Sequence, residues 1–305
     1  MNPHCVYIIC GATASGKTAV SISFAKHLST GIISADSRQC YKEISIGTAK
    51  PTLEQLREIP HYFIDEFPIA NELNAADFEK LALQYLDNIF QKSDTAIVCG
   101  GTGLYIKALC EGLDDMPETN KKIAEEIESA YNNQGMEWLQ QQIKKEDIEF
   151  YNTGEIQNPA RLIRALSFVR STGKSILSYR TNNKKQRPFS IIKIGLELPR
   201  EVLYARINQR VDDMMKDGLL DEVKRLYPFR NLKNLQTVGY SELFDYLGSK
   251  YSLEQAIEKI KQNTRHYAKR QMTWFRKDKE INWFNADDKD IIDKILTINK
   301  PDSKS

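Results

Sequence analysis

The 305-residue sequence has little of what marks a secreted, metal-binding or membrane protein. Its five cysteines form no CxxC pair, and an odd number of thiols fits a reducing compartment better than a disulfide framework. The four histidines are scattered without metal-ligand spacing, which argues against a structural zinc site. No apolar run is long enough to cross a bilayer, and residues 1–10 have neither a basic leader nor a cleavage site. These absences predict a cytoplasmic protein without a membrane segment.

Acidic residues are missing from one long stretch of the chain. The net charge of +2 says little by itself, but residues 156–196 contain no Asp or Glu. Nine basic residues lie in this stretch: Arg161, Arg164, Arg170, Lys174, Arg180, Lys184, Lys185, Arg187 and Lys193. The preceding stretch, 113–155, has 11 Asp or Glu against 4 Lys or Arg. Such separation is typical of a surface for a polyanion, although a solvated basic face without a partner explains it equally well.

Strand and helix patterns alternate through the first part of the chain. Short apolar runs predict strands at residues 6–10, 31–34, 62–64 and 95–99. Helical patterns lie at about 17–28 and 74–91. Strands that alternate with helices in this way favour a parallel, doubly wound sheet.

The pattern changes after Leu113, and no further strand is indicated before Phe189. The best-defined helix lies between them, with Asn158 as its cap, Pro159 in its first position and Gly173 at its end. A strand at 190–196 follows, and the remainder has a helical pattern, amphipathic at 201–227 and 253–276. We therefore predict three segments: the first part of a core at 1–115, a helical insertion at 116–188, and the rest of the core with C-terminal helices at 189–305.

Residues 11–18 match the phosphate-loop pattern GxxxxGK[ST] at every fixed position. They read Gly11-Ala12-Thr13-Ala14-Ser15-Gly16-Lys17-Thr18. The match follows a predicted strand and opens a predicted helix, which is the context that makes it informative. Backbone N–H groups of such a loop surround phosphate oxygens, Lys17 adds a positive charge, and the Thr18 hydroxyl can ligate Mg²⁺. The sequence thus predicts a P-loop α/β protein, in which helices flank a parallel sheet and a helical domain is inserted.

The loop identifies a polyphosphate but not which one. An ATPase or GTPase needs a second carboxylate for Mg²⁺ at the end of a later strand. The strand at 95–99 ends in Gly-Gly-Thr-Gly and supplies none, whereas Asp65 after the strand at 62–64 keeps nucleotide hydrolysis open. Asp36 follows the second strand. Loops at the carboxyl ends of parallel strands gather around the ligand, so Asp36 and Thr102 should lie near the phosphate loop. The alternative for Asp36 is an ordinary turn residue.

Further motifs follow the phosphate loop in order. They are 34–42 (SADSRQCYK), 46–51 (IGTAKP), 60–65 (PHYFID), 100–105 (GGTGLY), 161–166 (RLIRAL), 206–210 (RINQR), 238–240 (VGY), 264–265 (TR) and 268–274 (AKRQMTW). Along nearly its whole length the sequence therefore resembles the tRNA dimethylallyltransferase (tRNA isopentenyltransferase) family. It departs from the family at Ala12, where proline is usual, at Ala160, where glutamine is common, and at Gln236 and Ser241, where basic residues are frequent.

The resemblance implies transfer of a dimethylallyl group from dimethylallyl diphosphate to N6 of the adenine 3′-adjacent to the anticodon in tRNA. It implies that Asp36 is the general base, that Thr102 contacts the substrate nucleotide and that Arg210 stabilises the leaving diphosphate, with Mg²⁺ on Thr18. The implied tRNA contacts are Asp36, Ser37, Arg38, Gln39, Thr102, Arg161 and Arg164. The base must leave its stack to reach this chemistry. We expect the aromatic residues of the last helix, Tyr267, Trp274 and Phe275, in the core.

Two other enzymes fit many of the same residues. One is a prenyltransferase that acts on free adenine nucleotides, and the other is a small-molecule P-loop kinase in which arginines of the insertion close over bound ATP. The basic insertion favours a large RNA over a free nucleotide. A non-catalytic RNA-binding protein with a nucleotide switch is a third alternative, but it would not need Lys17, Thr18, Asp36 and Thr102 all intact.

Overall fold

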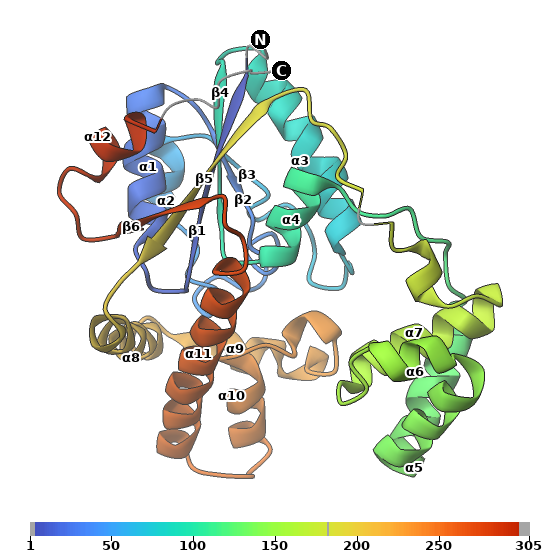
Figure 1. Cartoon of the computed structure of the whole chain (residues 1–305). Coiled ribbons are helices and arrows are strands. Elements are labelled where there is room, and N and C mark those ends of the chain that lie inside the picture. Colours follow the sequence, from blue (N-terminus) through green and yellow to red (C-terminus); the bar gives the residue numbers. More distant parts are fainter. Residues whose placement is uncertain (1–3, 182, 299–305) are drawn as a thin grey trace. The chain divides into compact units, whose positions relative to one another are not determined.

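The computed structural model describes residues 4–181 and 183–298 (Figure 1). The chain forms two compact units, of which the first comprises Met1–Glu111 and Gln186–Ser305 and the second Gly112–Lys185. The second unit overlaps the expected insertion at 116–188 but begins and ends a few residues earlier. In the described part of the chain, no helix combines the length and the apolar character that a bilayer span requires.

The first unit is built on a six-stranded sheet in which every neighbouring pair is parallel. The strand order is β3-β2-β4-β1-β5-β6. The strands are β1 (Cys5–Gly11), β2 (Ile32–Ser34), β3 (His61–Tyr62), β4 (Thr95–Gly100), β5 (Ser190–Glu197) and β6 (Ile281–Asn285). All residues of β1 are buried because it lies inside the sheet and both of its faces are covered, as its continuous apolar sequence requires. The predicted parallel α/β sheet is confirmed.

Helices cover both faces of this sheet (Figure 1). α1 (Lys17–Leu28) and α12 (Ile291–Leu296) share an apolar core with Tyr7 and Ile9 of β1. On the other face lie α3 (Ala75–Phe90) and α4 (Gly103–Glu111), joined by the stacked rings of Phe78 and Tyr105 at 4.4 Å. The short helix α2 (Leu53–Glu58) precedes the edge strand β3.

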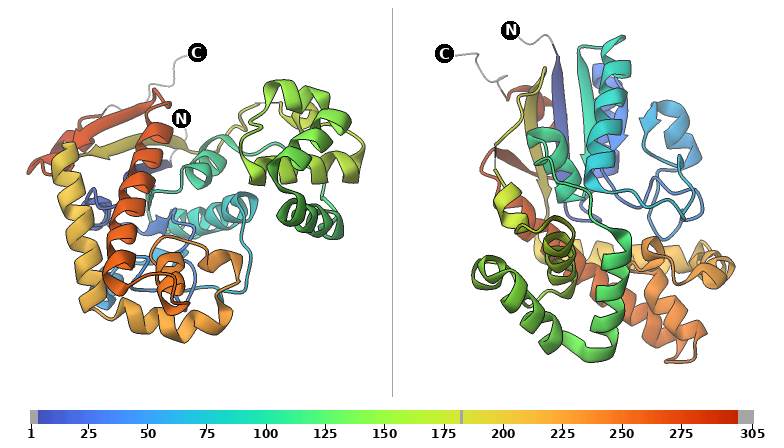
Figure 2. Two further views of the ribbon diagram at one scale, coloured as in Figure 1. Left: turned by 90° about the horizontal axis from the view of Figure 1, so that it is seen from below. Right: turned by 90° about the vertical axis from the view of Figure 1, so that its right-hand side faces the viewer.

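The remaining helices of this unit lie beyond the carboxyl ends of the strands, where α8 and α11 run side by side (Figures 1 and 2). They are α8 (Arg200–Lys216), α9 (Leu219–Leu226), α10 (Tyr240–Leu247) and α11 (Leu253–Phe275), with 3-10 turns at Tyr227–Phe229 and Lys233–Leu235. The amphipathic segment expected at 201–227 is thus two helices, because Gly218 adopts a φ of 98° and starts a new one. The expectation that only helices follow β5 was wrong: β6 pairs at the sheet edge, and within this short strand only Ile281 is buried.

The second unit is helical and has its own apolar core. Its elements are α5 (Lys121–Glu146), α6 (Ile148–Thr153), α7 (Pro159–Thr172) and a 3-10 turn at Ile176–Tyr179. α5 is interrupted at Gly135, and both of its halves pack on α7 through buried residues such as Ile127, Leu139 and Leu162. α7 begins and ends as its sequence predicts, since the Asn158 side chain accepts the N–H of Arg161 and Gly173 is left-handed.

Candidate active site

The phosphate loop connects β1 to α1 at the carboxyl edge of the sheet. Gly11 is required there, because a Cβ at this position would lie 2.5 Å from the carbonyl oxygen of Leu196. Gly16 caps α1 with a φ of 87° and has no side chain to occupy the first N–H groups of the helix. Those N–H groups and the positive end of the helix dipole are therefore directed at the site where an anion would bind.

Lys17 and Arg210 bring two positive charges to this loop. The Lys17 ammonium donates a hydrogen bond of 2.5 Å to the carbonyl oxygen of Ala12, and an Arg210 guanidinium nitrogen lies 3.4 Å from the Thr13 hydroxyl. Burial lowers the pKa of Lys17, and the neighbouring charge of Arg210 lowers it further. Burial also lowers the pKa of Arg210. Two desolvated cations side by side favour a bound anion, because its charge would offset both effects.

Arg210 is distinguished from its neighbour on α8 by its surroundings. The side chain of Arg206, one turn earlier, is 41% exposed and forms an ion pair of 2.6 Å with Asp287. Arg210 is half-buried and makes no ion pair with a carboxylate of residues 4–181 or 183–298. It lines a cavity of about 510 Å³ together with Asp65 and Asp213. A desolvated guanidinium without a carboxylate is suited to a phosphate ligand.

Asp36 lies in the turn that follows β2. One carboxylate oxygen, Oδ1, accepts the N–H of Arg38 at 2.8 Å and that of Gln39 at 3.4 Å. Asp36 therefore does serve as a turn residue, but both hydrogen bonds end on the same oxygen. The arrangement fixes the carboxylate and leaves Oδ2 for a proton on a substrate.

Thr102 is held beside this turn. Its hydroxyl oxygen accepts the N–H of Ser37 at 3.1 Å, and its own N–H donates to the carbonyl oxygen of Ala35 at 3.1 Å. The ends of β2 and β4 approach so closely that a Cβ on Gly100 would lie 2.2 Å from the Ala35 oxygen. The glycine run after β4 thus places Thr102 next to the Asp36 turn, as the sequence predicts for loops at neighbouring strand ends.

The other residues of the turn differ in their availability. The Gln39 side-chain amide is used inside the protein, since it accepts from the Ser34 hydroxyl and donates to the carbonyl oxygens of Thr48 and Ala49. The Arg38 guanidinium donates to the carbonyl oxygen of Ser37 at 3.1 Å. Ser37 and Arg38 are therefore the side chains of this turn that remain for a ligand, whereas Gln39 stabilises the turn through hydrogen bonds within the protein.

Asp65 is engaged by a lysine. Its carboxylate forms an ion pair with Lys50, whose side chain is buried, and its N–H donates to the carbonyl oxygen of Gln39 at 3.2 Å. The ion pair neutralises the carboxylate that would be needed for Mg²⁺ in nucleotide hydrolysis. Elsewhere in residues 4–181 and 183–298, no group of three His, Cys, Asp or Glu side chains is placed to hold a metal.

Gln271 of α11 connects the phosphate loop to the turn before Thr102. Its side-chain oxygen accepts the N–H of Thr13 at 2.8 Å, and its nitrogen donates to the carbonyl oxygen of Gly101 at 2.9 Å. A Cβ on Gly101 would lie 2.1 Å from that nitrogen. Nothing in the local sequence indicates this role, although Gln271 stands in the 268–274 motif that resembles the family.

The aromatic residues of α11 do not all lie in the core, contrary to expectation. Phe275 does, at 3% exposure. Tyr267 is only half-buried and lies near Asp36, so that burial and the aspartate charge both raise the pKa of its hydroxyl. Trp274 is 41% exposed. Tyr267 and Trp274 are thus partly accessible, whereas all three rings were expected in the core.

Glu222 is a second side chain whose role the local sequence does not indicate. It is 3% exposed and accepts three consecutive backbone N–H groups, those of residues 45–47, at 3.0–3.1 Å. The Tyr240 hydroxyl donates to the same carboxylate at 2.6 Å. These bonds fix the loop 45–50, which in turn supplies the carbonyl oxygens that hold Gln39.

Tyr240→Phe should lower the free energy of unfolding by about 1.5–3 kcal/mol, the range for a hydrogen bond to a charged group. Burial beside Glu222 raises the pKa of Tyr240 far above its usual value, so the hydroxyl stays a donor at neutral pH. Urea denaturation would measure the loss. Tyr246→Phe on the same helix is the control, because its hydroxyl makes no hydrogen bond to residues 4–181 or 183–298. Equal losses in the two variants would contradict the role of the Glu222 contact.

The basic stretch is largely neutralised, which corrects the expectation that its charge has no acid to balance it. Arg187 and Lys193 belong to the sheet unit, where the first pairs with Glu79 at 2.6 Å and the second with Asp278 and Glu280 at 2.7 and 2.6 Å. In the helical unit, ion pairs among the described residues include Arg161–Glu155, Arg170–Glu146 and Lys185–Asp115. Arg164 is exposed and has no carboxylate partner among the described residues.

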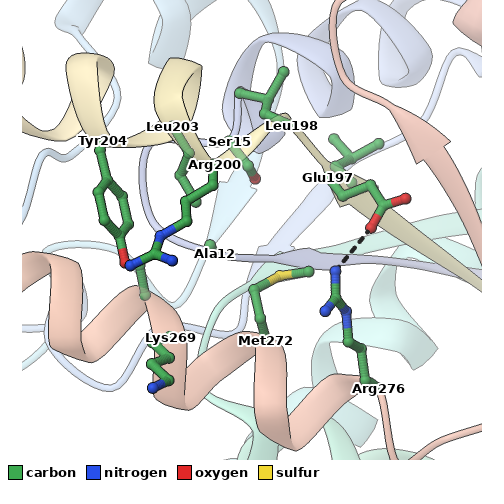
Figure 3. A pocket seen from close by; sticks show the side chains of 12 residues that line it. Ala12, Ser15, Glu197, Leu198, Arg200, Leu203, Tyr204, Lys269, Met272 and Arg276 are labelled. Carbon is green, nitrogen blue, oxygen red and sulfur yellow. Dashed lines mark hydrogen bonds and ion pairs between the residues drawn. The ribbon is translucent and has the colours of Figure 1, made fainter.

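A separate cavity of about 230 Å³ lies between the phosphate loop, β5, α8 and α11 (Figure 3). Leu203, Met272 and other apolar side chains form much of its wall, and the buried Ser15 hydroxyl has no hydrogen-bond partner within residues 4–181 and 183–298. The Arg276–Glu197 contact of 3.4 Å lies at its edge (Figure 3). None of Lys17, Asp36, Thr102 or Arg210 lines this cavity, so it is not the space in which the candidate catalytic groups meet.

Fold and site together define a P-loop α/β protein whose phosphate loop meets an acid and a hydroxyl from two neighbouring strand ends. Residues 39–278 match the model of the family described as IPP transferase. The chain is 46% identical to the tRNA dimethylallyltransferase of Cytophaga hutchinsonii, over 92% of both chains. It is 48% identical to that of Christiangramia forsetii, over 97% of this chain and 98% of the other.

Solved structures agree with the sequence relatives. The full-length tRNA isopentenylpyrophosphate transferase of Bacillus halodurans superposes with a TM-score of 0.69 at 37% identity, covering 96% of this chain and 93% of the other. A eukaryotic dimethylallyltransferase acting on tRNA gives a TM-score of 0.75 at 27% identity, covering 93% and 74%. The chain therefore belongs to the tRNA dimethylallyltransferase, or IPP transferase, family.

Proposed function

We propose that this protein transfers the dimethylallyl group of dimethylallyl diphosphate to N6 of the adenine 3′-adjacent to the anticodon in tRNA, with release of diphosphate. The observation that carries the proposal is the meeting of two kinds of group in one site. Lys17 and Arg210 provide a place for an anion, and Asp36 beside Thr102 provides an oriented proton acceptor. Membership of the family supports this reaction, and a tRNA substrate would be met in the cytoplasm.

On the donor side, negative charge grows on the diphosphate as the C–O bond breaks. The first N–H groups of α1, Lys17 and Arg210 would stabilise that charge, and they do so best in a desolvated site. Thr18 follows Lys17 in the first turn of α1 and is the side chain that would hold Mg²⁺. The charge of the ion would further neutralise the leaving group.

On the acceptor side, the adenine amine is a poor nucleophile because its lone pair is delocalised into the ring. Asp36 Oδ2 would take one amine proton as the new C–N bond forms. The Thr102 oxygen accepts a bond from Ser37, so its own O–H is free to orient and can donate to the base. A base stacked in the anticodon loop cannot reach these groups, so it must be extruded into the site.

Incubating the purified protein with total tRNA, labelled dimethylallyl diphosphate and Mg²⁺ tests the proposal. We expect label in tRNA without added nucleotide, loss of labelling when EDTA removes Mg²⁺, and no labelling of AMP. An absolute requirement for ATP would favour the P-loop kinase instead. Efficient prenylation of AMP would overturn the tRNA assignment but leave the donor and the role of Asp36 in place.

A matched pair of arginines on α7 tests the RNA contact of the helical unit. Arg164→Ala should weaken tRNA binding and reduce the slope of log K against log salt by about one, as expected when one phosphate contact is lost. Arg170→Ala removes the same charge, but Arg170 already bonds Glu146 at 2.7 and 2.9 Å. Its tRNA affinity should therefore change little. Filter binding across a salt series would measure both variants, and equal effects would contradict a specific contact by Arg164.

A further inference from the structure

Trp274 is exposed beside the candidate active site. Large apolar side chains are usually well buried, yet Trp274 is 41% exposed and the nearby Leu104 of α4 is 45% exposed. The edge of the indole lies on the backbone of Gly103, because a Cβ built on that glycine would be 2.2 Å from two indole ring atoms. Gly103 follows Thr102 directly. The indole is thus placed one residue from a group that the proposed reaction uses.

Trp274 belongs to the face of α11 that lines the site. Tyr267, Gln271 and Trp274 have the spacing i, i+4, i+7, which places them along one side of a helix. Tyr267 lies near Asp36, and Gln271 bonds Thr13 and Gly101. The face therefore runs from the carboxylate past the phosphate loop to Gly103, and Trp274 is its outermost ring.

The surroundings of the indole indicate what it would contact. Arg270 is exposed one turn before Trp274 on the same helix, whereas Lys269 and Arg276 line the separate cavity, where Arg276 contacts Glu197. A planar apolar surface next to an exposed cation suits single-stranded nucleic acid, in which bases stack on rings and phosphates pair with basic side chains. The Gly103 backbone leaves one edge of the ring packed, so the indole cannot turn freely and its plane is held for stacking.

We propose that Trp274 is a stacking platform for the anticodon-loop base next to the extruded adenine. The inference rests on the function proposed above. Extrusion removes one stacking partner from each base that flanks the adenine, and a fixed indole at the rim of the site replaces that partner for one of them. Leu104 extends the apolar surface at the start of α4. Trp274 would then position the RNA without contacting the reacting atoms.

Steady-state kinetics with an anticodon stem-loop would test this role. Trp274→Leu keeps apolar volume but no planar ring, and should raise KM for the stem-loop about 5- to 150-fold, the range for one base stacked on an aromatic ring. Trp274→Phe should stay within a few-fold of wild type. The kcat at saturating RNA should change much less than KM in both variants, because the ring lies outside the chemistry.

Stem-loops with a single abasic nucleotide identify the partner base. One substrate lacks the base on the 5′ side of the target adenine and the other lacks the base on its 3′ side. If Trp274 stacks on one of these bases, Trp274→Leu should raise KM hardly at all for the substrate that lacks that base. For the other abasic substrate it should raise KM as much as for the intact stem-loop. An equally large rise in KM for both abasic substrates would overturn the proposal.

Tryptophan fluorescence gives a readout independent of turnover. The chain has three tryptophans, and stacking of a base should quench Trp274, so the quench on stem-loop binding should shrink in Trp274→Phe. An unchanged quench, or a wild-type KM in a folded Trp274→Leu, would overturn the inference. If the wild-type protein labels no RNA at all, the proposed function fails instead, so the two failures are distinguishable.

Discussion

Asp36→Asn should lower the rate of prenyl transfer about 100- to 10,000-fold, the span usually found when a general base is lost. Asparagine keeps an Oδ1 that can still accept the N–H groups of Arg38 and Gln39, so the turn after β2 should persist. What the substitution removes is the proton acceptor at the second oxygen. The loss should therefore be seen in the single-turnover rate at saturating tRNA, and tRNA affinity should change little.

Asp65→Asn is the matched control for this experiment. It removes a carboxylate at a neighbouring strand end, but one that Lys50 already neutralises. We expect its rate to remain within several-fold of wild type. An unimpaired rate in Asp36→Asn together with a large loss in Asp65→Asn would move the base to Asp65.

Local features of the site could be predicted because they depend on short stretches of sequence. A phosphate loop needs glycine where the chain turns back and a helix that starts at its lysine, and both requirements are visible within residues 11–18. The limits of α7 follow equally from Asn158, Pro159 and Gly173. The proximity of Asp36 and Thr102 followed from one general rule, that the carboxyl ends of parallel strands meet at the same edge.

Contacts between distant segments could not be predicted in the same way. The hydrogen bond from Thr13 to Gln271 joins residues 258 positions apart, and Glu222 reaches loop 45–47 across more than 170 positions. Nothing in the local sequence distinguishes such side chains from ordinary helix residues. Both have the same physical role, since each forms hydrogen bonds with backbone polar groups of loops that have no regular partner.

The expectation of a basic surface from the acid-free stretch 156–196 was incorrect in part for a related reason. A stretch without acids in the sequence need not be a basic surface, because acids from elsewhere can pack against it. Arg187 is 108 positions from its partner Glu79, and Lys193 is more than 80 from Asp278 and Glu280. Desolvated cations require such partners, whereas exposed ones do not. Only the folded chain therefore separates Arg164, which is available to a phosphate, from Arg187, which is not.

The same distinction between paired and unpaired cations underlies the effect expected when Arg210 is replaced. Arg210→Ala should lower kcat/KM for dimethylallyl diphosphate about 100- to 1,000-fold, the cost of removing one donor that stabilises developing charge. Arg210 is half-buried near the Thr13 hydroxyl and lacks a carboxylate partner among the described residues, so a bound anion such as the proposed diphosphate would offset its charge. Lys17→Ala should reduce donor use in the same way.

Arg206→Ala provides the control, because it removes an arginine one turn earlier on the same helix that is exposed and bonded to Asp287. Its kcat/KM should stay close to wild type. Rates measured over a range of donor concentrations at saturating tRNA, with tRNA binding measured separately, would resolve the two effects. Arg210→Lys should recover part of the loss, since it restores the charge but not the paired donors of a guanidinium. If Arg210→Ala instead weakens tRNA binding and leaves donor use intact, Arg210 contacts the RNA and another group must stabilise the leaving diphosphate.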